Sequence, residues 1–339
     1  MTIAPPVGGS QRGVGVARAV KWAILSTARI NRKVIAGAHL SPKVELVAVA
    51  SRDQKRADEY AKTWEIQRAY GSYEALLADP EVEAVYISLP NSMHCEWAIE
   101  ALEAGKHVLC EKPLSRDASE VEEAFDAAHR MGRLLSEGFM YRHNPQTKRA
   151  KQLVDEGAIG QLRLIRSAFS YSLYDEANIR LHAELDGGAL MDIGCYAVSG
   201  SRLFAGEPEK VYGDAWFGPS GTDWVFAGVL RFPENVVAVF DCGTAMTERD
   251  ELEVVGSEGS LFLDDPWHCT APGIELRREG RVERIEVDLV DSYQLELENV
   301  SDAIRGDGEL LLGRNDAVAQ ARALEALHDS AIRAAPILL

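Results

Sequence analysis

The sequence predicts two domains: an α/β domain with a doubly wound parallel sheet, and an α+β domain with a large open, mostly antiparallel sheet. Three observations lead to this prediction. At 339 residues the chain is too long for one small core. Its first part alternates short apolar segments with amphipathic ones, which is the pattern of parallel strands joined by helices. Beyond Asn144 the segments alternate polar and apolar residues, which is typical of an antiparallel sheet.

The parallel sheet is predicted from four short apolar runs that suit strands buried on both faces. They are VKWAIL (20–25), VELVAVA (44–50), AVYISL (84–89) and HVLC (107–110). The helical segments between and after them are predicted at residues 29–38, 54–62, 93–104 and 118–131. The last helix begins behind Asp117, a residue type that often caps helix N-termini.

The pattern of polar and apolar residues changes after this α/β part. The predicted division is a loose N-terminal extension at 1–18, a first domain at 19–143 and a second domain at 144–339. The predicted elements of the second domain are helices at 146–155 and 187–204, a long strand at 161–173, and alternating strands between Val211 and Val287. Helices close the chain, and the C-terminal helix can pack back on the first domain.

Composition and charge exclude several classes of partner. The chain has the composition of an ordinary globular protein, and its formal net charge of −17 argues against nucleic acid or an anionic membrane surface. No segment is long enough to span a membrane, and the N-terminal stretch lacks the apolar run of a signal peptide. The five cysteines form no Cys-x-x-Cys pair and no metal-ligand cluster. We therefore expect a cytoplasmic protein with reduced thiols and no metal.

The loop after the first strand is where a doubly wound sheet binds a dinucleotide phosphate. It runs ILSTARINRKV, without the usual G-x-G-x-x-G, and Asn31 stands near the place of the last small residue. The candidate cofactor-binding residues of this loop are Ser26, Thr27, Ala28, Arg29 and Ile30. A hydroxyl and a cation here would face a pyrophosphate at the helix N-terminus. On local sequence alone, a plain strand-to-helix turn is an equally good interpretation.

The end of the second strand carries information on cofactor choice. An acid there usually binds the free ribose hydroxyl of NAD, whereas a cation accommodates the ribose phosphate of NADP. The segment VAVASRDQKR places Ser51 and Arg52 first, with Asp53 after them. A guanidinium offers two parallel donors to a phosphate, so the segment favours NADP over NAD. The alternative is a solvated helix start with Asp53 as its N-cap.

One lysine is placed in an unusual way. The segment AGKHVLCEKPLS (104–115) carries a strand to its tip and then sets Lys112 between Glu111 and Pro113. Proline has no N–H and pushes the preceding residue out of helical geometry. Lys112 is therefore held on a stiff joint just past a strand, a placement that a solvated surface lysine does not need.

At this point the residues carry a family resemblance. The segment from Tyr86 to Ser115, with Pro90, Asn91 and His94 ahead of the Glu-Lys-Pro, resembles the signature of the glucose-fructose oxidoreductase/inositol dehydrogenase (Gfo/Idh/MocA) family. The segments GFMYRHNPQ (138–146) and GGALMDIGCY (187–196) are most similar to its dihydrodiol dehydrogenase and D-xylose dehydrogenase branch. The resemblance implies a Rossmann domain, a C-terminal domain whose open sheet forms dimer contacts, and a homodimer or homotetramer.

The resemblance also implies an active site. Lys112, joined to Pro113 by a cis bond, would stand beside the nicotinamide with its ammonium toward the substrate oxygen. Its catalytic partners would be Asp192 and Tyr196, which share one helix face by their spacing. Further implied cofactor contacts are Leu89, Pro90, Asn91, His94, Glu111 and Lys112 itself. Further candidate substrate contacts, beside Lys112, Asp192 and Tyr196, are Tyr141, His143 and Arg180.

The chemistry expected at this site is hydride transfer with loss of a proton from the substrate oxygen. A tyrosine titrates near ~10 in water, so Tyr196 could act as the base only if its pKa fell by about 3 units. A neighbouring Lys112 ammonium would act in that direction. Asp192 would hold a neighbouring hydroxyl and steady the lysine. An ordinary buried Asp–Tyr hydrogen bond is the structural alternative, and hydride transfer needs no metal.

Three functional classes are compatible with these residues. The first is an NADP-dependent oxidoreductase acting on a sugar or polyol, like a D-xylose 1-dehydrogenase or a sugar ketoreductase. The second comprises a sugar–sugar oxidoreductase that keeps its NADP and a trans-dihydrodiol dehydrogenase. The third is a non-catalytic NADP-binding regulator, against which the combination of Lys112, Asp192 and Tyr196 argues.

Overall fold

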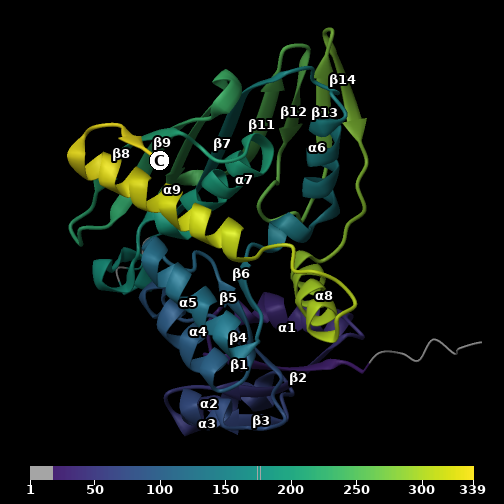
Figure 1. Ribbon diagram of the computed structural model, residues 1–339, viewed down its shortest axis with the longest axis vertical. Coiled ribbons are helices and arrows are strands. Elements are labelled where there is room, and N and C mark those ends of the chain that lie inside the picture. Colours follow the sequence, from purple (N-terminus) through teal and green to yellow (C-terminus); the bar gives the residue numbers. More distant parts are fainter. Residues whose placement is uncertain (1–17, 174, 176) are drawn as a thin grey trace, which may run out of the picture.

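A computed structural model describes residues 18–173, 175 and 177–339, and it contains the two predicted domains (Figure 1). The expected N-terminal extension lies, except for Arg18, outside the described residues. The first domain has a six-stranded parallel sheet with the order β3-β2-β1-β4-β5-β6. Its elements are β1 (Val20–Leu25), α1 (Asn31–Leu40), β2 (Val44–Ala50), α2 (Gln54–Thr63), β3 (Arg68–Tyr70), α3 (Tyr73–Leu77), β4 (Ala84–Ile87), η1 (Asn91–Met93), α4 (His94–Glu103), β5 (His107–Glu111), α5 (Ala118–Met131) and β6 (Leu135–Gly138).

The second domain carries a nine-stranded sheet with the order β14-β13-β12-β11-β7-β10-β9-β8-β15. Every pair in it is antiparallel except β7 with β10, so the predicted fold class is confirmed. Its strands are β7 (Leu162–Ser172), β8 (Lys210–Phe217), β9 (Asp223–Arg231), β10 (Val237–Gly243), β11 (Ala245–Gly256), β12 (Gly259–Leu263), β13 (Ile274–Arg278), β14 (Arg281–Ile285) and β15 (Ile337–Leu338). The short helix η2 (Met140–His143) leads into this domain, whose helices are α6 (Pro145–Asp155), η3 (Ile179–Leu181), η4 (Ala183–Leu185), the π-helical η5 (Leu190–Gly194), α7 (Cys195–Ala205), η6 (Pro233–Asn235), α8 (Ser292–Arg305) and α9 (Arg314–Arg333).

Local sequence explains where several of these elements begin and end. The central strand β1 is apolar on both faces because helices cover both sides of the parallel sheet. Asp117 caps α5 as predicted, accepting the Ser119 N–H, and Gly132 ends that helix in the left-handed conformation. The helix expected at 29–38 begins two residues later, at Asn31, because the residues before it form the loop at the end of β1. The expected helix at 187–204 divides into the π-helical η5 and α7.

The last two helices return to the first domain, as Figure 1 shows for α8 beside α1 and α9 above α5. From α8, the Ser301 hydroxyl accepts the Trp22 indole N–H at 3.1 Å, and Arg305 pairs with Glu83 at 3.0 Å. From α9, Arg322 pairs with Glu122 on α5. The C-terminal part of the chain therefore covers both domains.

One face of the large sheet is open. Helices α7 and α9 cover the other face, where Phe226 and Leu230 are fully buried. On the open face Trp216 is 56% exposed and pairs across the strands with Val225, and the exposed Tyr212 pairs with Val229. In the described residues no helix is long and apolar enough to cross a membrane.

Candidate active site

Lys112 stands where the sequence placed it, directly after β5 at the carboxyl edge of the parallel sheet. The Lys112–Pro113 peptide bond is cis, as the family resemblance implied. The ammonium reaches the second domain, where it donates to the Asp192 carbonyl oxygen at 2.5 Å and lies 3.8 Å from Asp192 Oδ1. The lysine side chain is only 10% exposed, so its charge lies at a nearly closed junction of the two domains.

The Asp192 carboxylate is held on both of its oxygens. Arg180 Nε donates to Oδ1 at 2.8 Å, and the Tyr171 hydroxyl donates to Oδ2 at 2.5 Å. Burial opposes the charge of this carboxylate, but Arg180 and Lys112 outweigh it, and its pKa is lowered. Asp192 is therefore an anion that fixes the groups around it, and it is unsuited to accept a proton.

Tyr171 is a site residue that the sequence analysis missed. It lies on β7, and burial together with the Asp192 charge raises its pKa, so the hydroxyl stays protonated and keeps donating. Strand alternation puts Tyr171 on the same face as Phe169, and this signal was readable in the sequence. The groups that this face contacts depend on the tertiary fold, which residue spacing cannot predict.

Tyr196 departs from the expectation in an important respect. The Lys112 ammonium lies 4.9 Å from the centre of its ring, over the ring rather than beside the hydroxyl. The hydroxyl donates to Met140 Sδ at 3.6 Å, inside a cluster with Phe139 and Phe169. Burial raises the pKa of Tyr196 well above its usual value, opposite to the direction expected for a base. The ammonium contacts the ring, whereas burial of the hydroxyl determines the direction of the Tyr196 pKa shift.

Tyr141 and His143 do not lie where substrate contacts were expected. The structure places both in the core, because η2 packs between α8 and α6 rather than at the site edge. The Tyr141 hydroxyl donates to Ser199 Oγ at 2.8 Å. Burial lowers the pKa of His143 to about 3, so this ring is neutral at physiological pH. Neither side chain reaches the Lys112–Asp192 pair.

The Glu111 side chain is hydrogen-bonded to β4. Its Oε1 accepts the hydroxyl of Tyr86 from β4, and burial raises the pKa of the carboxyl. Glu296 of α8 is buried nearby, and burial and the Glu111 charge raise its pKa well above the usual value. The Glu111 carboxyl, an expected cofactor contact, is thus bonded to Tyr86 and coupled to a second buried acid.

The segment ahead of α4 ties the two domains together. Asn91 Nδ2 donates to the Asp186 carbonyl at 2.9 Å, and Leu89 and Pro90 lead into this segment from β4. The His94 ring is buried, with Nδ1 2.8 Å from the Pro113 carbonyl and Nε2 2.9 Å from the Leu89 carbonyl. His94 therefore holds the backbone on both sides of the site, and its own ring faces no open space.

The end of β1 offers a set of donors that fits a dinucleotide phosphate. Helix α1 starts there, and its N-cap residue Ile30 makes no side-chain capping bond, so the positive end of the helix dipole faces this loop. The N–H groups of Asn31 and Lys33 bond to loop carbonyls. Thr27 and Ala28 are partly exposed and Arg29 is exposed in this loop. Loop and helix start thus have the chemistry that a pyrophosphate requires.

The end of β2 separates the two interpretations of its charged residues. Asp53 is the N-cap of α2, accepting the Arg56 N–H at 2.7 Å, as the structural alternative proposed. Arg52 is exposed, and among the described residues it makes no ion pair. Ser51 is buried beside it, with its N–H bonded to the Tyr70 carbonyl. Asp53 is thereby occupied, while the Arg52 guanidinium remains available to a phosphate.

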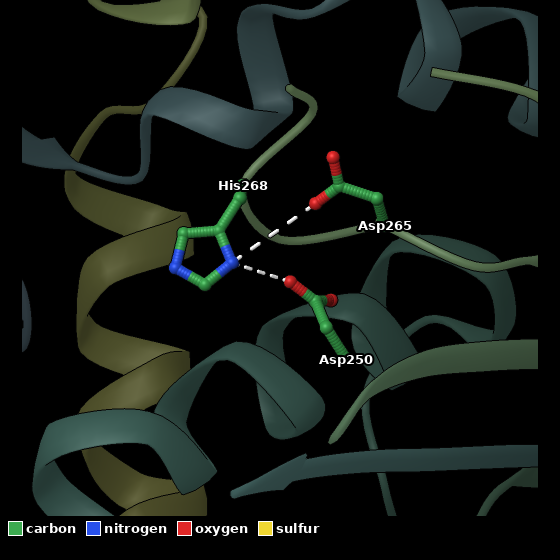
Figure 2. A group of neighbouring side chains, drawn as sticks. All are labelled: Asp250, Asp265 and His268. Atoms are coloured by element: carbon green, nitrogen blue, oxygen red, sulfur yellow. Dashed lines mark hydrogen bonds and ion pairs between the residues drawn. The ribbon is translucent and has the colours of Figure 1, made fainter. Parts of the chain in front are cut away.

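Among the residues that the structure describes, the fold assembles a group of metal-ligand type that spacing had not revealed (Figure 2). His268 Nδ1 lies 2.5 Å from Asp250 Oδ2 and 4.0 Å from Asp265 Oδ1. Both carboxylates are engaged elsewhere, because Asp250 Oδ1 accepts the Trp267 N–H and Asp265 Oδ2 accepts the N–H of Thr270. These bonds satisfy the group internally, as a histidine–carboxylate pair that fixes a loop, and we assign it no metal.

Comparison with known proteins agrees with this geometry. A model described as an oxidoreductase family with an NAD-binding Rossmann fold matches residues 20–139, and a model described as the GFO/IDH/MocA C-terminal domain matches residues 147–262. The chain is 38% identical to D-xylose 1-dehydrogenase (NADP(+)) 2 of Haloferax volcanii, over 94% of this chain and 99% of that protein. It is 32% identical to trans-1,2-dihydrobenzene-1,2-diol dehydrogenase of Xenopus tropicalis, over 75% of this chain and 78% of that protein.

A solved structure shows the same fold. It is a 3-ketoreductase from Actinomadura kijaniata in complex with NADP and TDP-benzene, which superimposes with a TM-score of 0.87 at 29% identity. The superposition covers 92% of this chain and 98% of the ketoreductase.

Proposed function

Because the chain belongs to the Gfo/Idh/MocA oxidoreductase family, we propose that it is an NADP-dependent oxidoreductase that transfers hydride between the nicotinamide and a carbon of a sugar or polyol. The substrate class proposed first is an aldose oxidised at C1, with D-xylose as the test compound; the relative named as a D-xylose 1-dehydrogenase, aligned over nearly its whole length, supports this choice. Reduction of a keto sugar is the same chemistry in the opposite direction.

The observation that carries the proposal is the mounting of Lys112. Its ammonium is anchored by the Asp192 carbonyl, while Arg180 and Tyr171 occupy the Asp192 carboxylate. An ammonium has three N–H donors, and this anchoring leaves donors for a substrate oxygen. A nearly buried cation aimed at the place where oxygen charge develops is the arrangement that stabilises such a charge best.

The proton step then falls to Lys112 rather than to Tyr196. A bound nicotinamide supplies or receives the hydride. In reduction, Lys112 Nζ donates the proton that the carbonyl oxygen takes up as its carbon receives the hydride. In oxidation, the uncharged amine accepts the proton from the substrate hydroxyl. The role of Asp192 is to hold Nζ in place and to balance the charges of Lys112 and Arg180.

The preference for NADP is supported by Arg52 and Ser51 at the end of β2. The guanidinium is exposed, and the acid next to it in the sequence, Asp53, is used as a helix cap. Arginine binds phosphate in a planar, two-donor geometry. The relatives whose names or complexes include NADP are consistent with this proposal.

The test is an assay of steady-state turnover with NADP and NAD, on a panel of aldoses, inositols, keto sugars and a trans-dihydrodiol. Turnover with D-xylose or another aldose that falls by about a hundredfold or more in Lys112→Met supports the proposal. Ping-pong kinetics with NADP that survives gel filtration would identify a sugar–sugar oxidoreductase instead. Tight NADP binding without turnover of any compound would identify a regulator.

We further propose that the chain forms a homodimer, or a tetramer of dimers, through the open face of the large sheet. The exposed Trp216, Tyr212 and Val229 give this face an apolar area that a monomer rarely leaves in water. A cytoplasmic location is supported by the five cysteines, all of which are buried and free. Light scattering that returned the monomer mass of 37.2 kDa at micromolar concentration would refute the dimer.

A further inference from the structure

The loop between β1 and α1 makes a glycine-type turn without a glycine. Ser26, the first residue after β1, has φ of +124°, which lies in the region that L-residues rarely adopt. A non-glycine residue keeps such a backbone conformation only where the surrounding structure holds it there. The contacts of Ser26 should therefore show what holds the turn.

Two other buried side chains provide these contacts. Asn31 Nδ2 donates to the Ser26 carbonyl at 3.0 Å, and the Ser88 hydroxyl donates to Asn31 Oδ1 at 2.6 Å. The hydroxyls of Ser26 and Ser88 are 2.8 Å apart, which closes the ring. Asn31 is fully buried, and both serines are less than a tenth exposed. Each partner thus constrains the others in a dry setting, where such bonds are strong.

The ring joins the three elements that meet at the dinucleotide edge of the sheet. Ser26 follows β1, Ser88 follows β4, and Asn31 is the first residue of α1. The Ser26 hydroxyl also accepts the Ala28 N–H at 3.1 Å, so the ring reaches into the middle of the loop. The orientation of the uncapped first turn of α1 therefore depends on this ring.

We propose that Ser26, Asn31 and Ser88 form a positioning network that replaces the missing glycines and holds the loop for the diphosphate of the dinucleotide. The network acts through the backbone of the loop, and none of its three side chains needs to touch the cofactor. The inference rests on dinucleotide binding by the first domain and is independent of which sugar is the substrate.

The network predicts a pattern of affinities that Arg52 cannot produce. NAD and NADP share the diphosphate, so breaking the network should weaken both equally. Losing one buried hydrogen bond corresponds to a rise in Kd of about 2- to 12-fold. We expect this rise for Ser88→Ala and for Asn31→Ala, whereas Arg52→Ala should weaken NADP alone.

Relief of the strain provides the decisive comparison. Glycine adopts the conformation of residue 26 without cost, so Ser26→Gly should make the loop less dependent on Asn31. In the Ser26→Gly background, Asn31→Ala should change the Kd by less than about twofold, a non-additivity expected of groups that act as one unit. If Asn31→Ala acted only on stability, it would lower Tm in both backgrounds. The rise in Kd that it causes would then be the same with Ser26 and with Gly at this position.

The experiment is titration of the full chain with NADPH and NADH, followed by nicotinamide fluorescence, with Tm recorded for each variant. The control is Ser41→Ala, which removes a buried hydroxyl at the other end of α1 and should leave both Kd values unchanged. Equal weakening of both dinucleotides that disappears in the Ser26→Gly background supports the network. Wild-type Kd values in folded Ser88→Ala, or additive effects in the double variants, overturn it. If the wild-type protein bound neither NADPH nor NADH, the dinucleotide-binding function itself would be refuted. That result differs from both outcomes above, in which the wild-type protein binds.

Discussion

Replacing Lys112 by methionine tests the assignment of the proton step. Methionine keeps the unbranched shape of the side chain, is one atom shorter, and removes its charge and donors. The Asp192 carboxylate retains its bonds from Arg180 at 2.8 Å and Tyr171 at 2.5 Å, so no buried anion is left unpaired and the fold should persist. A positioned acid–base group contributes about 10²–10⁴-fold to the rate, and we expect kcat to fall within that range.

The matched comparison is Tyr196→Phe. This variant removes only the contact of a hydroxyl with Met140 Sδ at 3.6 Å, and a thioether is a weak acceptor. The ring that lies under the Lys112 ammonium is retained, so kcat should stay within about fivefold of the wild type.

The assay is the pH dependence of kcat with the best sugar of the panel, together with the Kd of NADPH for each variant. The limb that reports the proton-transferring group should be present in the wild type and in Tyr196→Phe, and absent in Lys112→Met. Cofactor affinity should change little in either variant. A hundredfold or larger loss in Tyr196→Phe with an altered limb, beside substantial activity in Lys112→Met, would refute the assignment and restore tyrosine as the base.

Three further predictions address cofactor choice, stability and assembly. Arg52→Ala should raise the Kd of NADP about tenfold or more and leave that of NAD unchanged; equal changes for both would contradict the phosphate contact. Burial raises the pKa of Glu137 to about 8 from 4.5, so its stabilising contribution is complete below the unfolded value and is lost as the pH rises toward the folded one. Glu137→Gln should therefore flatten the fall of unfolding free energy over this range by about 1.4 kcal/mol per pH unit, and an unchanged slope in urea titrations would count against it. Trp216→Glu on the open sheet face should convert the dimer to a monomer in light scattering without loss of helix content; a dimer that persists would point to another interface.

Most strands and helices of the first domain could be predicted because the sequence patterns that mark them are local. Apolar runs bounded by turn residues mark strands buried on both faces, and the proline after Lys112 marks the strand tip. The short strands β3 (RAY) and β6 (LSEG) escaped prediction because neither contains a run of apolar residues like that of β4. The position of Lys112 directly after β5 was predictable because the strand end and the following proline decide it.

Side chains whose role depends on packing were not predictable in the same way. Spacing put Asp192 and Tyr196 on one face, but it could not show that the Tyr196 hydroxyl ends at Met140. Tyr171 contributes to the site only because β7 packs against η5, which carries Asp192, and this is a relation between distant segments. The sign of the Tyr196 pKa shift was wrong in the sequence analysis because burial of the hydroxyl was not visible there.

The return of α8 and α9 to the first domain limits how this protein could be recombined with its relatives. An exchange of everything after residue 143 would import another second domain, but it would also remove the Ser301 partner of Trp22 and the Arg305 partner of Glu83. The imported C-terminal helices would then have to pack on a first-domain surface that fits the native ones. Grafting a new specificity onto this chain therefore requires an insertion that ends before Ser292 and leaves the native C-terminal helices in place.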